Sequence, residues 1–212
     1  MSMLLDIHLH TQRHSPCSYI DEFELIRKAI QAGLHGMVIT DHHYQWSGEE
    51  LEGLLRVSGA PGFLLLAGFE YTSARGDMLV YGLKPEHARQ FELGEDPERV
   101  VDRIHALGGV CVAAHPTRAG LGYDERIAHM ALDGIEVASV NLSGREQEMA
   151  RGLADTLGLR PTASSDAHRL YDVGAYCTEF DGTIQDMADF CEAVREGRFR
   201  PGIPVMQRKV GA

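Results

Sequence analysis

The chain has 212 residues and an ordinary apolar fraction of 44%, which is enough for a full core, so we expect residues 1–212 to form one domain. Its formal net charge of −11 argues against a long nucleic acid as a partner, because such binding needs a basic surface. No apolar stretch approaches the ~18 residues of a membrane span. The N-terminus lacks the basic and apolar segments of a signal peptide, so we expect a cytoplasmic protein.

Amphipathic helical patterns alternate with short apolar runs along the chain. Helices are predicted to begin at Asp21, Asp96, Ser143 and near Thr183, and the first three patterns end at Gly33, Gly108 and Gly158. Apolar runs at 36–40, 63–69, 110–114 and 160–164 are typical of buried parallel strands. This alternation predicts an α/β fold, either a small barrel or, as the alternative, an open doubly wound sheet. The alternative has no Gly-rich nucleotide-binding motif to support it.

Residue spacing also predicts which helix faces are buried and where one hairpin forms. The first helix is expected to bury Phe23, Ile26 and Ile30, and the third to align Met149, Leu153 and Leu157. The segment 77–83 is expected to pair with the run at 63–69. The chain after Arg200 is expected to be extended and peripheral.

Five of the apolar runs lead directly into side chains that bind metals. These side chains are His8 and His10, Asp41 and His42, Glu70, His115, and Asp166 and His168. In a parallel barrel the carboxyl ends of the strands meet at one mouth, where such folds place their chemistry. The sequence therefore predicts a site for several metal ions at that mouth.

The spacing of these side chains indicates how each one acts. His8 and His10 are two residues apart on a strand and share a face, so both rings can bind one ion. His42 is expected to be a ligand, with Asp41 fixing the orientation of its ring. An isolated buried carboxylate such as Glu70 is costly, so it needs a metal or a partner, and it can bridge two ions.

In this order the motifs resemble those of the PHP (polymerase and histidinol phosphatase) domain family. The matching strings are DIHLHT at 6–11, ITDH at 39–42, GFE with Glu70, AHP at 114–116, IEV at 135–137 and SSDAH at 164–168. The resemblance covers the chain from Asp6 to about Phe180. It implies a distorted (β/α)7, TIM-like barrel with its metal site at the carboxyl ends of the strands. It also implies two or three Zn²⁺, Mn²⁺ or Fe ions and phosphoester hydrolysis.

The resemblance also implies how the ligands are shared among the ions. One ion would be held by His8, His10, Glu70 and Asp166, and a second by Glu70, His115 and one further ligand. A third would take His42, His168 and a residue of the loop at 11–18, either His14 or Cys17. Asp77 stands where many members have a histidine, which should shift the preference toward harder ions such as Mn²⁺ or Fe²⁺.

The mechanism that these ligands predict is attack by a hydroxide on phosphorus. Bound metals lower the pKa of a water from ~15.7 to about 7. Glu70, Asp166 and His168 are the candidate catalytic residues, and Arg118 and Arg169 are candidate phosphate ligands. A small anionic phosphorylated substrate is therefore expected, with Trp46 or Tyr123 as candidate stacking residues over its organic part.

Two other functions remain open. An amidohydrolase-type enzyme cleaving C–N bonds also uses H-x-H, later histidines and a late aspartate. However, its binuclear members commonly use a carboxylated lysine at a strand end, and none of this chain's lysines lies in an apolar run. The other alternative is a catalytically silent PHP domain that serves as a binding module.

Overall fold

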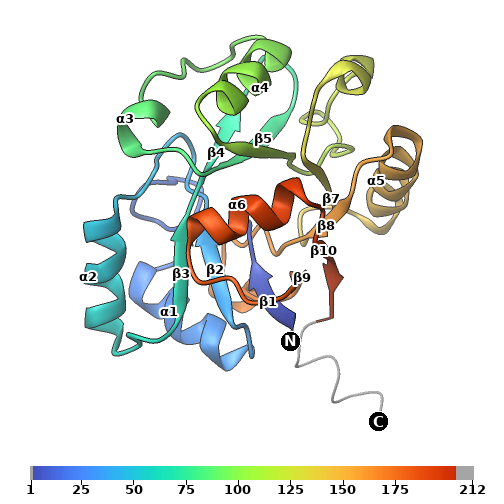
Figure 1. Cartoon of the computed structure of the whole chain (residues 1–212). Helices are drawn as coiled ribbons and strands as arrows, with labels where there is room; N and C mark the ends of the chain where they lie inside the picture. The colour runs from blue at the N-terminus through green and yellow to red at the C-terminus, as the bar shows by residue number, and fades with distance from the viewer. Residues whose placement is uncertain (1, 204–212) are drawn as a thin grey trace.

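The computed structural model describes residues 2–203, and Figure 1 shows its strands and helices in chain order. The strands are β1 (Ser2–Asp6), β2 (Gly36–Ile39), β3 (Leu64–Ala67), β4 (Phe69–Thr72), β5 (Asp77–Tyr81), β6 (Val110–Ala113), β7 (Gly134–Ala138), β8 (Pro161–Ala163), β9 (Cys177–Asp181) and β10 (Phe199–Gly202). The α-helices are α1 (Glu22–Gln31), α2 (Gly48–Ser58), α3 (Pro85–Ala88), α4 (Pro97–Ala106), α5 (Gly144–Leu157) and α6 (Met187–Arg195). Two 3₁₀ helices, η1 (Glu125–His129) and η2 (Leu170–Asp172), complete the elements. Within 2–203, no helix combines the length and the apolar character needed to cross a membrane.

The strands form two five-stranded mixed sheets, ordered β10-β9-β1-β2-β3 and β4-β5-β6-β7-β8. Strands β1, β2 and β3 are parallel, as are β6, β7 and β8. Strand β5 runs antiparallel to both of its neighbours, and so does β9. The α/β class is confirmed, but the strands of residues 2–203 form neither one closed (β/α)7 barrel nor one open sheet. Two departures from strand–helix alternation accompany this arrangement: β4 and β5 are joined by a short turn without a helix, and β9 pairs with β1 in the antiparallel sense.

The expected strand at 63–69 is divided between the two sheets. It breaks at Gly68, where β3 of the first sheet ends and β4 of the second sheet begins. A Cβ atom at Gly68 would lie 2.4 Å from the carbonyl oxygen of Val80, so only glycine fits this close approach. The predicted hairpin is confirmed, since β5 pairs antiparallel with β4 and places Leu79 opposite Glu70.

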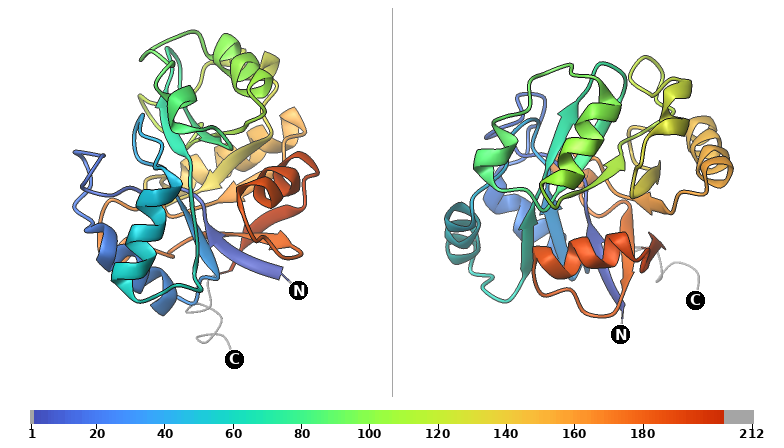
Figure 2. Two further views of the ribbon diagram at one scale, coloured as in Figure 1. Left: turned by 60° about the vertical axis from the view of Figure 1, so that its left-hand side comes forward. Right: turned by 45° about the horizontal axis from the view of Figure 1, so that its top comes forward.

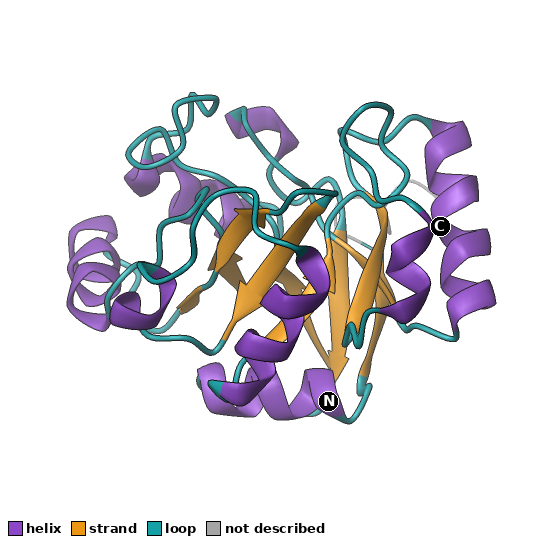
Figure 3. Cartoon of the chain, turned by 90° about the horizontal axis from the view of Figure 1, so that it is seen from above, coloured by secondary structure: helices purple, strands orange, loops and turns teal. Residues whose placement is uncertain are grey.

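An apolar core fills the space between the two sheets. The first sheet contributes Leu5, Val38 and Leu66, and the second contributes Leu79 and Val112, from alternate positions along their strands. Helix α6 adds Phe190 and Val194 to the same core at the amino ends of the strands. Seen from above in Figure 3, the strands lie at the centre and the helices surround them.

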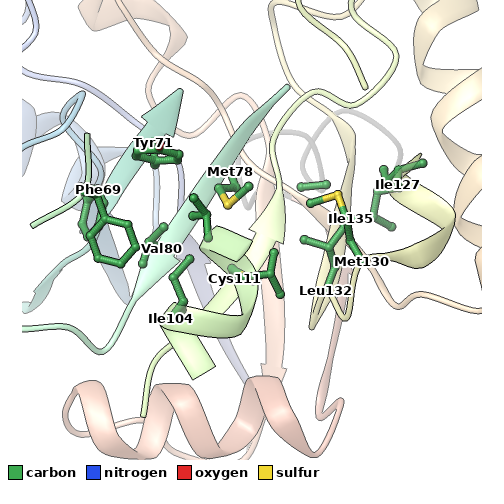
Figure 4. Close-up of a cluster of buried hydrophobic side chains, with 14 of the residues drawn as sticks. Phe69, Tyr71, Met78, Val80, Ile104, Cys111, Ile127, Met130, Leu132 and Ile135 are labelled. Atoms are coloured by element: carbon green, nitrogen blue, oxygen red, sulfur yellow. The ribbon is translucent and has the colours of Figure 1, made fainter. Parts of the chain in front are cut away.

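Two further apolar clusters cover the outer faces of the sheets. Helices α1 and α2 pack on the first sheet, and Figure 2 shows these two helices side by side. Helices α4 and α5 and the segment around η1 pack on the second sheet. Figure 4 shows Phe69 and Val80 near Ile104 of α4, and Ile135 near Ile127 and Met130. The α/β layers thus bury both faces of each sheet.

The predicted helix starts are confirmed for α1, α4 and α5. The side chains of Asp21, Asp96 and Ser143 each accept hydrogen bonds from the first turn of their helix. The last helix starts at Met187, later than expected, and its N-cap is Asp186. Helix α2 was not predicted, although Ser47 and Glu50 form a capping box at its start.

Two predicted helix faces are wrong in part. Ile30 of α1 is 45% exposed and Met149 of α5 is 52% exposed. In α5 the buried positions are Ala150 and Ala154, whose small side chains let the helix approach β7 closely. At the C-terminus, β10 continues the chain to Gly202, and the expectation for residues 204–212 lies outside the described residues.

Candidate metal centre

The metal-binding side chains expected at the strand ends converge on one site. Four groups of three have ligand atoms within 4.8 Å of one another. The groups are His8, His10 and Glu70; His8, His115 and Asp166; His10, His42 and His168; and Glu70, Asp77 and His115. They follow β1, β2 and β6, lie in β4 and β5, or follow β8, so strands of both sheets build the site. Overlapping groups of this kind suit two or three neighbouring ions.

Glu70 lies at the centre of the cluster. Its Oε1 is 2.9 Å from Nε2 of His115, and its Oε2 is 3.1 Å from Nδ1 of His42. The same Oε2 lies 3.3 Å from Nε2 of His10 and 3.4 Å from Nε2 of His8. One buried carboxylate therefore faces four imidazoles, an arrangement compatible with a carboxylate that bridges two ions.

Glu136 contacts two histidines of the site. Its Oε1 is 3.1 Å from Nδ1 of His8, and its Oε2 accepts a hydrogen bond of 2.9 Å from the backbone N–H of His115. Because a carboxylate accepts the proton on Nδ1, the Nε2 atom of His8 is left free to face Glu70 and Asp166. In the sequence, the only sign of this role was a glutamate within the apolar run at 135–137.

The charges at the site depend strongly on one another. Burial disfavours charged histidine, yet Asp166, Glu136 and Glu70 raise the pKa of His8 well above its ordinary value. Against the same burial, hydrogen bonds that Asp166 and Glu70 accept from the ring raise the pKa of His10 to about 9. Burial would raise the pKa of Glu70, but the charges and hydrogen bonds of the histidines hold it well below the usual range. At the outer side of the site the shift is reversed, because burial lowers the pKa of His42 to about 4 and also lowers that of His168.

One buried carboxylate oxygen provides a direct test of whether the residues fit a cation. Oδ2 of Asp166 is buried and accepts no hydrogen bond within residues 2–203, and the Nη1 atom of Arg118 is 3.9 Å away. An unpaired buried carboxylate oxygen is costly unless a cation lies beside it. Together with the imidazole and carboxylate donors, this oxygen fits a divalent metal ion.

Backbone strain is also concentrated at the site. His115 has a φ of 27° and Asp166 a φ of 52°, both in the region that non-glycine residues rarely adopt. Such strain costs on the order of 1–3 kcal/mol per residue and clusters at functional sites. Both residues belong to the metal-binding groups, so the surrounding fold maintains their strained conformations where the ligands are needed.

The structure separates the two candidate ligands in the loop at 11–18. Neither His14 nor Cys17 belongs to the four groups, and His14 lies in an aromatic stack, with its ring centroid 3.4 Å from that of Tyr44. Cys17 instead lines a cavity of about 210 Å³ over the site. The other residues that line this cavity are His42, Glu70, Asp77, His115, Arg118, Leu121, Asp166 and His168.

The other expected side chains fall into two sets. Asp77 faces the site, and burial raises the pKa of its carboxyl group. Arg118 also lines the cavity, but Arg169 is exposed and lies over the ring of Tyr19 at 5.0 Å. Of the two expected phosphate ligands, only Arg118 is therefore placed beside the metal centre.

Trp46 is not available as a stacking surface, and Tyr123 is half-buried and does not line the cavity over the site. The indole of Trp46 is buried and its Nε1 donates to Asp41 over 2.8 Å. The hydroxyl of Tyr123 donates to the carbonyl oxygen of Asp77 over 2.6 Å. The expected contact of Asp41 with the ring of His42 is also wrong. Within residues 2–203, the Asp41 carboxylate accepts from Thr11, Ser15 and Trp46 instead.

Comparisons with known proteins agree with these motifs. A family model described as PHP-associated matches residues 144–199. Uncharacterized protein MJ1587 of Methanocaldococcus jannaschii is 26% identical over 147 residues, which cover 64% of this chain and 81% of that protein. PsfC from Pseudomonas syringae PB-5123 shares the fold with a TM-score of 0.72 and 20% identity, over 99% of this chain and 94% of PsfC.

Other solved structures share the fold and differ in what they are named for. A two-domain protein of Bacteroides vulgatus ATCC 8482 containing a predicted PHP-like metal-dependent phosphoesterase matches with a TM-score of 0.72 and 15% identity, over 96% of this chain and 65% of that one. Endonuclease Q of Pyrococcus furiosus matches with a TM-score of 0.72 and 14% identity, over 95% of this chain and 58% of that one. An endonuclease Q has also been seen with a duplex carrying an abasic lesion. An amidohydrolase of Chromobacterium violaceum with bound sulfate matches with a TM-score of 0.63 and 19% identity, over 93% of this chain and 97% of that one.

These neighbours share the fold of this chain. The chain therefore resembles PHP proteins in its motifs, in the PHP-associated match over residues 144–199 and in its fold.

Proposed function

We propose that this protein hydrolyses a small phosphate ester, either a phosphomonoester or a nucleotide-type ester, at a site for two or three divalent ions. The observation that carries the proposal is Glu70, a buried carboxylate within 3.4 Å of four histidine rings. On this proposal, the two sheets are the two halves of a distorted (β/α)7 barrel. Bound ions would supply a hydroxide near neutral pH and neutralise charge on the phosphoryl group.

On this proposal, separate groups of residues hold the ions, take part in catalysis and bind the phosphate. His8, His10, Glu70 and Asp166 would hold one ion, and Glu70, Asp77 and His115 a second. His42 and His168, with Cys17 rather than His14, would hold a third. Glu70, Asp166 and His168 remain the proposed catalytic residues. Arg118 would bind the phosphate oxygens, because its guanidinium borders the cavity that these ligands line.

Elemental analysis combined with a hydrolysis assay tests this proposal. The protein would be stripped with a chelator and then supplied with Mn²⁺, Zn²⁺ or Fe²⁺ in the presence of a generic aryl phosphate. We expect two to three ions per chain and turnover that returns with metal. A chain that binds no metal after this treatment would refute the site itself, whereas bound metal without turnover on phosphate esters would refute the proposed reaction.

An amidohydrolase reaction is the second candidate, favoured by the fold of the Chromobacterium violaceum neighbour. A panel of amides assayed beside the aryl phosphate on the same metal-loaded protein distinguishes the two reactions. Turnover of amides alone would select this candidate and exclude the phosphoesterase.

Nucleic acid is a further candidate substrate, and the endonuclease Q neighbours run against our expectation that charge excludes it. The exposed face near His168 also suits bases: Tyr19 is 71% exposed, Tyr171 is 73% exposed, and Arg169 lies over Tyr19. Aromatic side chains with arginine form stacking surfaces for single strands. Binding of a labelled oligonucleotide to the wild type and to Tyr19→Ala tests this surface, and equal binding by the two proteins would exclude it.

A further inference from the structure

A buried hydrogen-bond network lies behind the ring of His10, on the side opposite the metal centre. The Nδ1 atom of His10 is 3.3 Å from Oγ of Ser15. Its other nitrogen, Nε2, is 3.2 Å from Nε2 of His8, 3.3 Å from Glu70 and 3.4 Å from Asp166. The two ring nitrogens therefore face different groups, and which of them carries a proton decides whether the ring can bind an ion.

Asp41 is the end point of this network. Its Oδ1 accepts hydrogen bonds from the N–H of Thr11 at 2.7 Å and from Oγ of Ser15 at 2.6 Å. Its Oδ2 accepts from Oγ1 of Thr11 at 2.7 Å and from Nε1 of Trp46 at 2.8 Å. A backbone amide and an indole can only donate, so the Asp41 carboxylate acts as an acceptor for its neighbours. All four residues are buried, so water does not replace these contacts.

In this arrangement, Ser15 donates its single hydroxyl proton to Asp41. The same oxygen also accepts the backbone N–H of His42 over 3.0 Å. With its proton directed at Asp41, Ser15 can only accept from His10. Nδ1 of His10 therefore carries the proton of this contact, so Nε2, which faces Glu70 and Asp166, is the nitrogen that can give its lone pair to an ion.

We propose that Ser15 and Asp41 are positioning residues that select the Nδ1–H form of His10 and so present its Nε2 to the metal. The proposal rests on the proposed function, because it assumes that His10 binds an ion. Within residues 2–203, the hydrogen bonds of the Ser15 and Asp41 side chains reach the metal-binding groups through the ring of His10 and the backbone of His42. The backbone carbonyl of Asp41 also accepts from the N–H of Glu70 over 3.2 Å. Outer partners of this kind commonly change metal affinity about 10- to 100-fold.

The loop offers a matched control for the test. Ser18 is also buried, and its Oγ donates to the backbone carbonyl of His10 over 2.9 Å rather than to the ring. Ser15→Ala and Ser18→Ala each remove one hydroxyl from the same loop next to the same residue. A purely structural role of the loop would make the two variants alike, whereas the proposed role makes only Ser15→Ala weaken metal binding.

The experiment measures Zn²⁺ affinity by chelator competition and the protonation of His10 by long-range ¹H–¹⁵N NMR of the Zn²⁺-loaded full chain. We expect Nε2 bound and Nδ1 protonated in the wild type, an affinity roughly 10- to 100-fold weaker in Ser15→Ala, and a wild-type affinity in Ser18→Ala. Nδ1 as the bound nitrogen, or equal affinities for the wild type and Ser15→Ala, would overturn the inference. Failure of the wild type to bind Zn²⁺, Mn²⁺ or Fe²⁺ would instead refute the proposed function.

Discussion

The two ends of the space between the sheets are built from opposite chemistry. At the carboxyl ends of the strands, Glu70 and Asp166 lie buried among histidines. At the amino ends, Phe190 of α6 packs against Tyr81 with ring centroids 4.9 Å apart and against Phe180 at 5.1 Å. One end is therefore a cluster of ionisable side chains, and the other is a cluster of packed aromatic rings.

This difference separates stability from function. Burial of the aromatic rings at the amino ends is favourable by itself, at about 25 cal/mol for each Å² of apolar surface. Burial of carboxylates and imidazoles is unfavourable unless charges and hydrogen bonds balance it. We infer that the apolar end maintains the fold, and that the polar end is maintained because it binds ions.

The largest expected effect is on catalysis at the polar end. Asp166→Ala or His8→Ala should lower hydrolysis by at least about 10³-fold, since a bound metal supplies several kcal/mol of transition-state stabilisation. Metal content should fall while circular dichroism stays that of a folded protein. Retained turnover in either variant would remove that residue from the proposed site.

At the apolar end, Phe190→Ala should reverse this pattern. Loss of a buried phenyl ring should lower the free energy of unfolding by about 3–5 kcal/mol, while metal affinity of the folded protein is unchanged. Urea denaturation measures the first effect and chelator competition the second. Val57→Ala, at a 64% exposed position, is the control and should stay within about 0.5 kcal/mol. A large loss of metal affinity in Phe190→Ala would show that the two ends are not independent.

A smaller effect is expected from the arginines near the polar end. Arg118→Ala should reduce kcat/KM for a small alkyl phosphate by roughly 10- to 100-fold, because a charge-assisted contact to the phosphate is lost. Arg169→Ala, which removes the exposed arginine over Tyr19, should leave this value close to that of the wild type. The reverse ranking would assign phosphate binding to Arg169.

The smallest effect concerns the loop that carries Arg118. Glu146 accepts hydrogen bonds from Ser143 and from the N–H of Ala119, and the Ser143 hydroxyl is the main cause that lowers its pKa from 4.5 to about 2. A carboxyl group with a lowered folded-state pKa stabilises the fold above its unfolded pKa and loses that effect as the pH falls. The stability difference between the wild type and Glu146→Gln should be constant above pH 4.5 and shrink toward pH 2. The difference is measured by urea denaturation at each pH. A difference that does not change with pH would contradict this account.

Much of this protein was predictable from the sequence because the signals are local. Helix caps such as Asp21 and Ser143 act on the next three residues, so their pattern is visible in one dimension. Metal-binding residues at the ends of apolar runs are brought together by any fold that aligns the strand ends. The order of the motifs was therefore enough to predict the α/β class, the likeness to PHP proteins and the convergence of the candidate ligands, while their roles as metal ligands stay predictions.

Only the tertiary structure decided the features that depend on distant contacts. The chain passes from one sheet to the other at Gly68, where the backbone lies against Val80. Strand β9 pairs antiparallel with β1, although the two strands lie near opposite ends of the sequence. The location of Cys17 over the site, and of His14 on Tyr44, depends on how Asp41 anchors the loop at 11–18. No local pattern encodes such contacts, because each depends on the packing of residues that are far apart in the sequence.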